Sequence, residues 1–151
     1  MKLAEALQER ADLNRKISQL ESRLLENSFT QDGIEPAEDP DKLLEELDRC
    51  VARLERLIAA INEANTQTKV DGRTLTEIIA RKDCLGVKSG VLNSVIGSAS
   101  GAITRYTRTE IKIVRTVDVR ALQKKVDKLA KEVRELDNQL QQANWTTDIA
   151  I

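Results

Sequence analysis

The sequence predicts an all-α protein built from long, antiparallel, coiled-coil-like helical hairpins, with about four helices and a short extended segment before the last one. Two observations predict this class. Apolar residues recur every three or four positions over long stretches, which is the spacing of one face of a helix. Charged residues make up 32% of the 151 residues and aromatic residues only 2%, a composition typical of long helices.

The length favours one domain over residues 1–151, since 151 residues supply enough material for one core. Within it, residues 1–64 are expected to form a first hairpin and residues 74–144 a second helical pair. Charge differs between the two parts, because residues 1–64 hold 9 basic and 15 acidic side chains while 65–151 hold 15 and 10. Opposite net charges favour contact between the parts or between subunits.

The first hairpin is predicted from two apolar repeats and one irregular connection. A helix should run from about residue 3 to 26, and the stretch 27–40, with Asp32-Gly33 and two prolines, predicts a loop. A second helix should begin near Pro40 or Asp41, where proline is tolerated and an acid complements the helix dipole. Its expected seam is Leu44, Leu47, Val51, Leu54, Ile58 and Ile61, backed by Leu43 and Leu57.

The third helix is predicted from a capping signal and differs from the others in charge. After a polar turn over 65–73, Thr74 and Glu77 have the spacing of a capping box. No charged residue occurs between Ser89 and Thr104, and an uncharged helix is usually buried on all sides. Because glycine costs about 1 kcal/mol in a helix, the repeated glycines indicate close backbone approach. We expect this helix to lie at the centre of an assembly, with Gly86, Gly90, Gly97 and Gly101 against a neighbour.

Residues 105–117 are the hardest segment to assign, and strand, loop and helix all remain open, with an extended segment favoured by their Thr, Ile and Val content. Asp118 is expected to cap a fourth helix that ends near Ala143 and Asn144. Trp145 should then pack on a hairpin as an anchor. The fourth helix has the most regular seam, consisting of Val119, Leu122, Val126, Leu129, Val133, Leu136, Leu140 and Ala143.

Catalytic chemistry is not expected. The chain has no histidine, so Ser-His and Cys-His nucleophiles are excluded, and neither a G-x-S-x-G elbow nor a phosphate-binding loop occurs. Cys50 and Cys84 lack metal-binding spacing and are expected to be reduced. The sequence therefore predicts no enzyme, no cofactor and no metal site.

Self-association is the predicted function, as a dimer or larger assembly with a scaffold or partner-binding role. The alternative is nucleic-acid binding by the basic face of residues 105–134, where cations would neutralise phosphates. The same charges could instead pair with acidic helices. The candidate nucleic-acid contacts are Arg105, Arg108, Lys112, Arg115, Lys124 and Lys128.

Membrane insertion and export are not expected. The uncharged stretch from Ser89 to Thr104 is shorter than the roughly 20 apolar residues that span a bilayer, and burial between subunits is preferred for it. The N-terminal residues MKLAEALQER are charged throughout, so no secretory signal is predicted. We therefore expect a cytoplasmic protein with no membrane partner.

Six motifs in order resemble a bacterial family of uncharacterised helical proteins, some of them labelled septicolysin. They are MKLAEALQERADLNRKISQL at the start, EDP at 38–40, GRTLTEIIARKD at 72–83, RYTRTEIK at 105–112, TVDV at 116–119 and ANWTTD at 143–148. The resemblance covers nearly the whole chain. It implies an all-helical fold with long hairpins and self-association, with a hexamer among the assemblies it allows. It implies no catalytic or binding residue.

Overall fold

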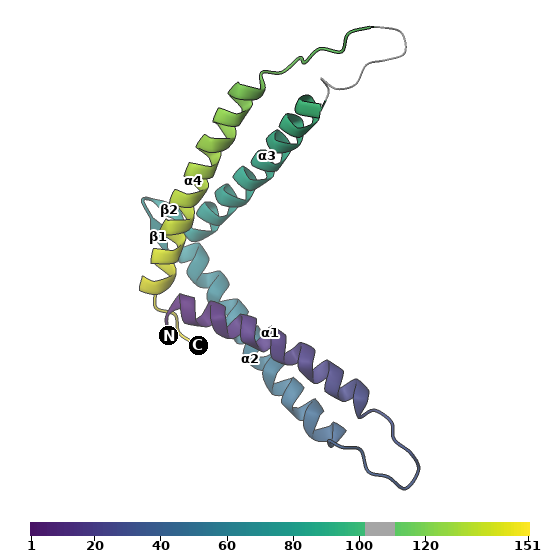
Figure 1. The fold of residues 1–151 in the computed structure, drawn as a ribbon. Helices are drawn as coiled ribbons and strands as arrows, with labels where there is room; N and C mark the ends of the chain where they lie inside the picture. Colours follow the sequence, from purple (N-terminus) through teal and green to yellow (C-terminus); the bar gives the residue numbers. More distant parts are fainter. Residues whose placement is uncertain (102–110) are drawn as a thin grey trace. The chain divides into compact units, whose positions relative to one another are not determined.

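The computed structural model describes residues 1–101 and 111–151 of the chain. Its elements in chain order are α1 (Leu3–Glu26), α2 (Pro40–Gln67), β1 (Lys69–Val70), β2 (Arg73–Thr74), α3 (Leu75–Gly101) and α4 (Val119–Thr146) (Figure 1). The two short strands pair with each other. The predicted all-α class with long helices is confirmed.

The chain divides into two compact units. The first unit comprises Met1–Lys69 and Gln142–Ile151, and the second comprises Val70–Gln141. The first unit contains α1, α2 and the C-terminal segment, while the second contains α3 and most of α4. The single domain over residues 1–151 stays a prediction.

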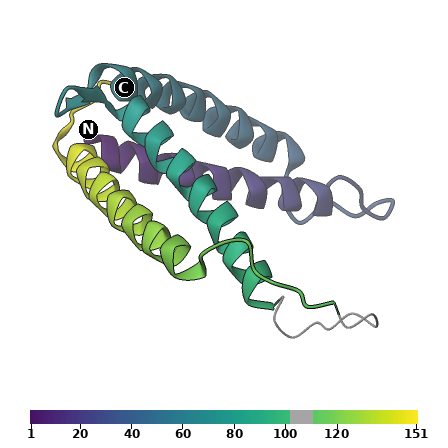
Figure 2. The same ribbon diagram turned by 90° about the horizontal axis from the view of Figure 1, so that it is seen from above.

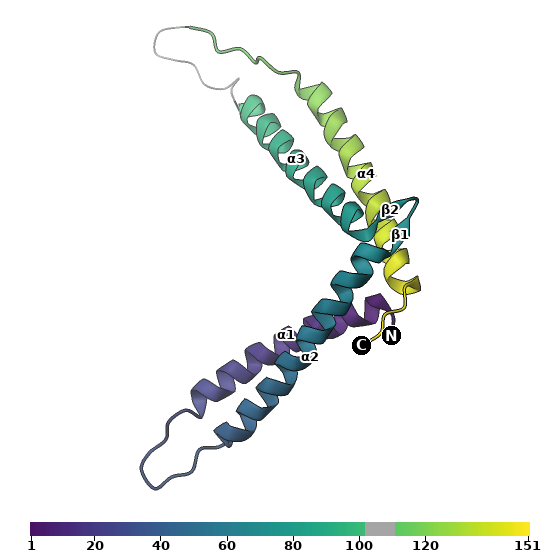
Figure 3. The ribbon, with the colours of Figure 1, turned by 180° about the vertical axis from the view of Figure 1, so that it is seen from behind.

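In the first unit, α1 and α2 lie side by side and antiparallel (Figures 1 and 3). Leu20 of α1 is fully buried, and it packs in one cluster with Leu43 and Cys50 of α2. Leu57 and Ala64 extend the buried row of α2 at seven-residue intervals. A seven-residue interval returns to almost the same side of a helix, so this row faces α1.

The predicted seam of α2 is partly wrong. Leu44, Val51 and Ile58 are 47%, 47% and 39% exposed, whereas the row one residue earlier is buried. Adjacent helical residues point about 100° apart, so only one of two neighbouring rows can face α1. The row that includes the small Cys50 and Ala64 side chains faces inward, because small side chains let two helix backbones approach closely.

The connection over residues 27–39 lies at one end of the α1–α2 hairpin (Figure 2), and the buried Asn27 holds it in place. The Asn27 amide donates to the backbone oxygen of Arg23 at 2.8 Å and its side-chain oxygen accepts from the backbone N–H of Glu38 at 2.9 Å. The Arg23 guanidinium also donates to the Glu38 carboxylate, with Nε 2.9 Å from Oε2. Asp39 then caps α2 by accepting the Asp41 N–H at 3.0 Å.

Two ion pairs cross from α1 to α2. The Arg53 guanidinium donates twice to the Glu9 carboxylate, at 2.7 and 2.9 Å, and Lys16 Nζ lies 2.8 Å from the Glu46 carboxylate. The hydrogen bond from Arg53 lowers the pKa of Glu9, and the one from Lys16 lowers the pKa of Glu46. Both carboxylates are therefore stabilised in their ionised form.

The predicted start of the third helix is confirmed. The Glu77 N–H donates to the Thr74 hydroxyl at 3.2 Å, and the Glu77 carboxylate accepts the Thr74 N–H at 2.7 Å, which is a capping box. Before it, Asp71 and Gly72 have φ values of 50° and 83°, the left-handed conformation that a tight hairpin turn between β1 and β2 requires. Leu75, Ile78 and Leu85 are the buried residues of α3.

The outer half of α3 is not enclosed by the described residues of its own chain. Val87 and Val91 are 70% and 58% exposed. A Cβ built on any glycine of α3 would meet no atom within 4 Å, so the predicted close approach does not occur within the described chain. Burial of this helix in an assembly stays a prediction.

The fourth helix confirms its predicted seam. Val126, Leu129, Leu136 and Leu140 are buried on α4, which runs beside α3 (Figures 1 and 3). Arg81 and Lys82 of α3 form ion pairs at 2.8 Å with acidic residues of α4. None of the described helices has an apolar stretch long enough to cross a bilayer.

The start of α4 agrees with the prediction, and its end lies beyond the predicted one. The Asp118 carboxylate accepts the Ala121 N–H at 3.1 Å, so the predicted cap is confirmed. The helix continues to Thr146, two residues past the predicted end, and Trp145 is 59% exposed rather than packed. Two residues turn a helix by about 200°, which puts Trp145 opposite the buried Ala143.

The segment before α4 is only partly described. Residues 111–115 have no regular secondary structure, as the favoured extended assignment allows, and residues 105–110 of the same prediction lie outside the described residues.

Substitutions at neighbouring positions of α2 test which row faces α1. Leu57→Ala should lower the free energy of unfolding by about 2–5 kcal/mol, because it leaves a cavity in a fully buried site. Ile58→Ala should lower the free energy of unfolding of the single chain, which does not depend on protein concentration, by about 1 kcal/mol or less. Urea unfolding at several protein concentrations measures both. If Ile58→Ala lowers this free energy as much as Leu57→Ala or more, the side of α2 with Ile58 faces α1 instead.

Acid should weaken the first unit through its ion-paired carboxylates. The pKa values of Glu9, Glu38 and Glu46 are lowered in the folded protein, chiefly by hydrogen bonds from basic partners. Their stabilisation is complete above the unfolded pKa of about 4.3 and is lost as pH falls through the lower folded values. The melting temperature should therefore decrease as the pH is lowered below about 5. The decrease should be less steep in the Glu9→Gln variant. Identical profiles for the two proteins would contradict this.

Candidate functional site

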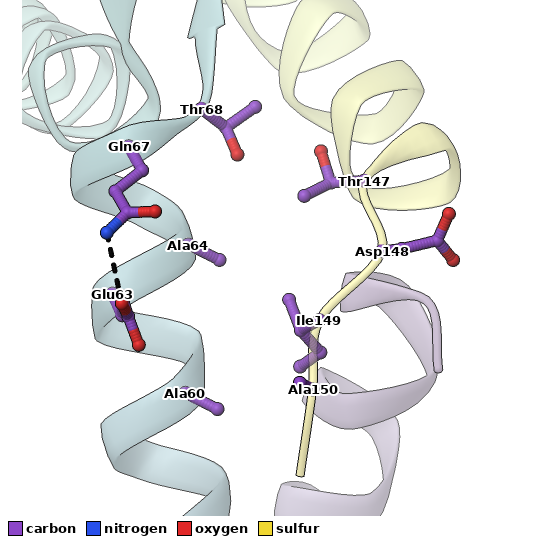
Figure 4. Close-up of a pocket in the computed structure, with 9 residues that line it drawn as sticks. All are labelled: Ala60, Glu63, Ala64, Gln67, Thr68, Thr147, Asp148, Ile149 and Ala150. Atoms are coloured by element: carbon purple, nitrogen blue, oxygen red, sulfur yellow. Dashed lines mark hydrogen bonds between the residues drawn. The ribbon is translucent and has the colours of Figure 1, made fainter.

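The first candidate site is a pocket of about 260 Å³ in the first unit, between the last turns of α2 and the C-terminal segment (Figure 4). Its α2 wall includes the small side chains of Ala60 and Ala64, and Ile149 lies on the opposite wall. The other lining residues are Glu63, Gln67, Thr68, Thr147, Asp148 and Ala150.

The pocket exists because the two ends of the chain pair with each other. Lys2 and Asp148 form an antiparallel bridge, flanked by a hydrogen bond from the Leu3 N–H to the Thr147 oxygen and one from the Ile149 N–H to the Met1 oxygen, both 2.9 Å. Lys2 Nζ also lies 2.8 Å from the Asp148 carboxylate and lowers its pKa. The C-terminal segment is thereby fixed opposite α2.

Three of the polar side chains that line this pocket, Glu63, Gln67 and Asp148, already have side-chain partners. The Gln67 amide donates to the Glu63 carboxylate at 3.0 Å, and the Asp148 carboxylate points away from α2 toward Lys2 (Figure 4). Nucleophilic catalysis needs a nucleophile and a base within hydrogen-bond reach. Among the residues that line this pocket, the structure shows no nucleophile hydrogen-bonded to a base.

The second candidate site is an open apolar groove of about 600 Å³ on the α1–α2 hairpin, near the connecting loop. Its lining residues are Ile17, Glu21, Leu24, Leu25, Ser28, Pro40, Leu44 and Leu47. Leu44 is also the first residue of the exposed row of α2. Val51 and Ile58 continue this row, so groove and row form one apolar surface along α2.

Acidic residues border that apolar surface. Asp41, Asp48 and Glu55 stand three positions before the three residues of the exposed row, and all three are exposed. Residues three apart are neighbours on a helix surface, so the row has a negatively charged edge along its length. This arrangement was not predicted, although the apolar and acidic positions share a seven-residue repeat that is visible in the sequence.

The third candidate site is the predicted basic face. Arg105 and Arg108 lie outside the described residues, and Arg115 donates from Nε to the backbone oxygen of Ala99 at 2.9 Å. Lys112, Lys124 and Lys128 are exposed.

Two further cations of the predicted basic face lie beside Lys124 and Lys128. Arg120 and Lys131 lie on the same side of α4 as Lys124 and Lys128, because these residues are three or four positions apart. Together the four cations form an exposed stripe of about 16 Å, at 1.5 Å per residue.

Within the described part of the chain, no three metal-ligating side chains come together. Cys50 is buried and Cys84 is exposed, and neither forms a disulfide in the structure.

Comparison with known proteins gives a family but no activity. The model of a family of unknown function (DUF6847) matches residues 10–149. The crystal structure of a functionally unknown conserved protein from Corynebacterium diphtheriae matches with a TM-score of 0.89 and 37% sequence identity, over 99% of each chain. No curated protein matches. Neither match supports the label septicolysin.

Filling the pocket beside the chain ends tests its geometry. Ala60→Leu should leave the free energy of unfolding nearly unchanged, since Ala60 borders open space. Ala6→Leu is the matched control, because Ala6 of α1 is fully buried, and overpacking there should cost about 1–3 kcal/mol. Denaturant unfolding compares the two. A cost at Ala60 as large as that at Ala6 would show that the pocket does not exist in solution.

Proposed function

The chain belongs to the family of unknown function DUF6847, and we propose that it is a self-associating helical protein with a non-enzymatic scaffold or partner-binding role. The observation that supports this proposal is the apolar surface formed by the groove and the row Leu44, Val51 and Ile58. A helix row of this kind is normally covered by another helix.

Burial of this surface supplies the driving force. Removing apolar area from water yields about 25 cal/mol per Å², and contiguous apolar patches on soluble proteins usually mark interaction sites. Three half-exposed aliphatic side chains in register, continuous with a groove, present such a patch. A second copy of the chain is always present at the same concentration as the first, so it is the partner that we propose.

The ionisable groups support a role without catalysis. A general acid or base works best with a pKa near the operating pH. The shifts in this protein go the other way, since the pKa of Glu9 is lowered and the pKa of Lys16 is raised by their ion-pair partners. These pairs keep their charges fixed at neutral pH, as structural ion pairs do.

The proposal places the protein in the cytoplasm. Both cysteines are free in the structure. Cytoplasmic thiols remain reduced, whereas oxidising compartments favour disulfides.

Light scattering coupled to size exclusion tests self-association. The wild-type protein should give the mass of a dimer or a larger assembly, a hexamer included. Val51→Asp should reduce that mass, because association would bury an unpaired carboxylate, which costs several kcal/mol. Ala11→Asp makes the same charge change on the exposed side of α1 and should keep the wild-type mass. A wild-type mass of one chain at all concentrations would refute the proposal.

Nucleic-acid binding is the second candidate function, and the stripe Arg120, Lys124, Lys128 and Lys131 favours it. Four exposed cations along one helix face could neutralise several phosphates, and such binding weakens steeply with salt. In a mobility-shift assay at low salt, Lys124→Glu/Lys128→Glu should lose any shift that the wild-type protein gives with a mixed-sequence RNA or DNA. Lack of a wild-type shift removes this candidate.

A further inference from the structure

The exposed apolar residues are concentrated in two segments of the chain. Of the fifteen large hydrophobic residues exposed in the described part, ten lie within residues 24–48 or within 84–101 and 111–117. The first segment is the loop end of the α1–α2 hairpin. The second comprises the outer part of α3 and the residues that precede α4. We call them the acidic surface and the basic surface, because their charges are opposite.

The acidic surface combines apolar side chains with strong negative charge. Residues 24–48 include nine acidic side chains and one basic side chain. The exposed Leu25, Phe29, Ile34 and Leu44 lie among them, and Phe29 is 81% exposed. Most of the apolar groove lies within this surface. A partner that fits must therefore be apolar and positively charged.

The basic surface meets that description. Its described residues, 84–101 and 111–117, include no acidic side chain and three basic ones, Lys88, Lys112 and Arg115. Val87 and Val91 are exposed on α3, and Val114 and Val117 are exposed before α4.

One row of α3 has the form of a groove ligand. Cys84, Val87, Val91 and Ser94 follow one another at intervals of three or four residues, and all four are exposed. An apolar groove typically binds a helix through residues at this spacing.

We propose that the acidic surface of one copy binds the basic surface of a second copy, an inference that rests on the proposed self-association. Charge complementarity selects this pairing over contact between two acidic surfaces, which would bring two strongly negative segments together. The apolar groove of one copy and the exposed row of α3 in the other copy supply the buried area. Lys88 and Lys112 supply positive charge for the acidic residues around the groove. The contact is head-to-tail, so it closes either reciprocally between two chains or around a ring.

Charge reversal on each surface, followed by mixing, tests this pairing. Lys88→Glu/Lys112→Glu reverses two charges and takes the described basic surface from +3 to −1, and Glu26→Lys/Asp48→Lys reverses two charges and takes the acidic surface from −8 to −4. All four side chains are exposed, so the variants should keep wild-type helix content by circular dichroism. Lys124→Glu/Lys128→Glu is the matched control, because it changes the same charge on α4 outside both surfaces.

The expected result is selective loss and recovery of association. At low salt, each reversed variant alone should associate at least about tenfold more weakly than the wild-type protein. Their equimolar mixture should recover an assembly, because the unaltered acidic surface of one variant then meets the unaltered basic surface of the other. The control should keep the wild-type mass, and added salt should weaken the wild-type assembly.

Three outcomes would overturn the inference. Wild-type mass in both reversed variants would overturn this pairing while leaving self-association in place. Loss of mass in both variants without recovery on mixing would equally exclude a direct contact between the two surfaces. A wild-type protein that is monomeric at every concentration would overturn the pairing and the proposed function together.

Discussion

The side of α2 that faces α1 decides which apolar row of α2 the first unit buries and which it exposes. Two neighbouring rows of α2 are apolar, but a helix in a two-helix hairpin can cover only one of them. The row with Cys50 and Ala64 permits close packing and is buried, and the row with Val51 stays at the surface. A stable fold and an exposed apolar surface thus come from the same helix, since burial of one row leaves the other without cover in a single chain.

Local signals in the sequence predicted the helices well. The bounds of α1, the capping box at Thr74 and the cap at Asp118 agree with the structure, because each depends on residues a few positions apart. The rotation of α2 was not predictable in the same way. Both rows satisfy the same periodicity, and only packing against α1 distinguishes Cys50 from Val51. Trp145 was misplaced because its side depends on where α4 ends.

The candidate surfaces were predicted only in outline. The basic run and the uneven charge were predicted from the sequence, but the groove was not, because it needs Ile17 of α1 and Leu47 of α2 together. The hydrogen bond from the Arg115 guanidinium to the backbone oxygen of Ala99 in α3 was not predicted either. Charge is segregated in the fold itself, since the first unit holds 10 basic and 16 acidic side chains and the second holds 14 and 9. The proposed contact between two copies relies on this segregation, because opposite charges favour contact between the acidic and the basic surface.

The central claim is that the exposed row of α2 is open in one chain and covered by another copy. Reaction of a thiol at position 51 measures this directly, using Val51→Cys with Cys84→Ser, since native Cys50 is buried. A small thiol reagent should label the thiol at position 51 rapidly in dilute protein, and labelling should become slower as the protein concentration increases. A labelling rate that is the same at every concentration would contradict it.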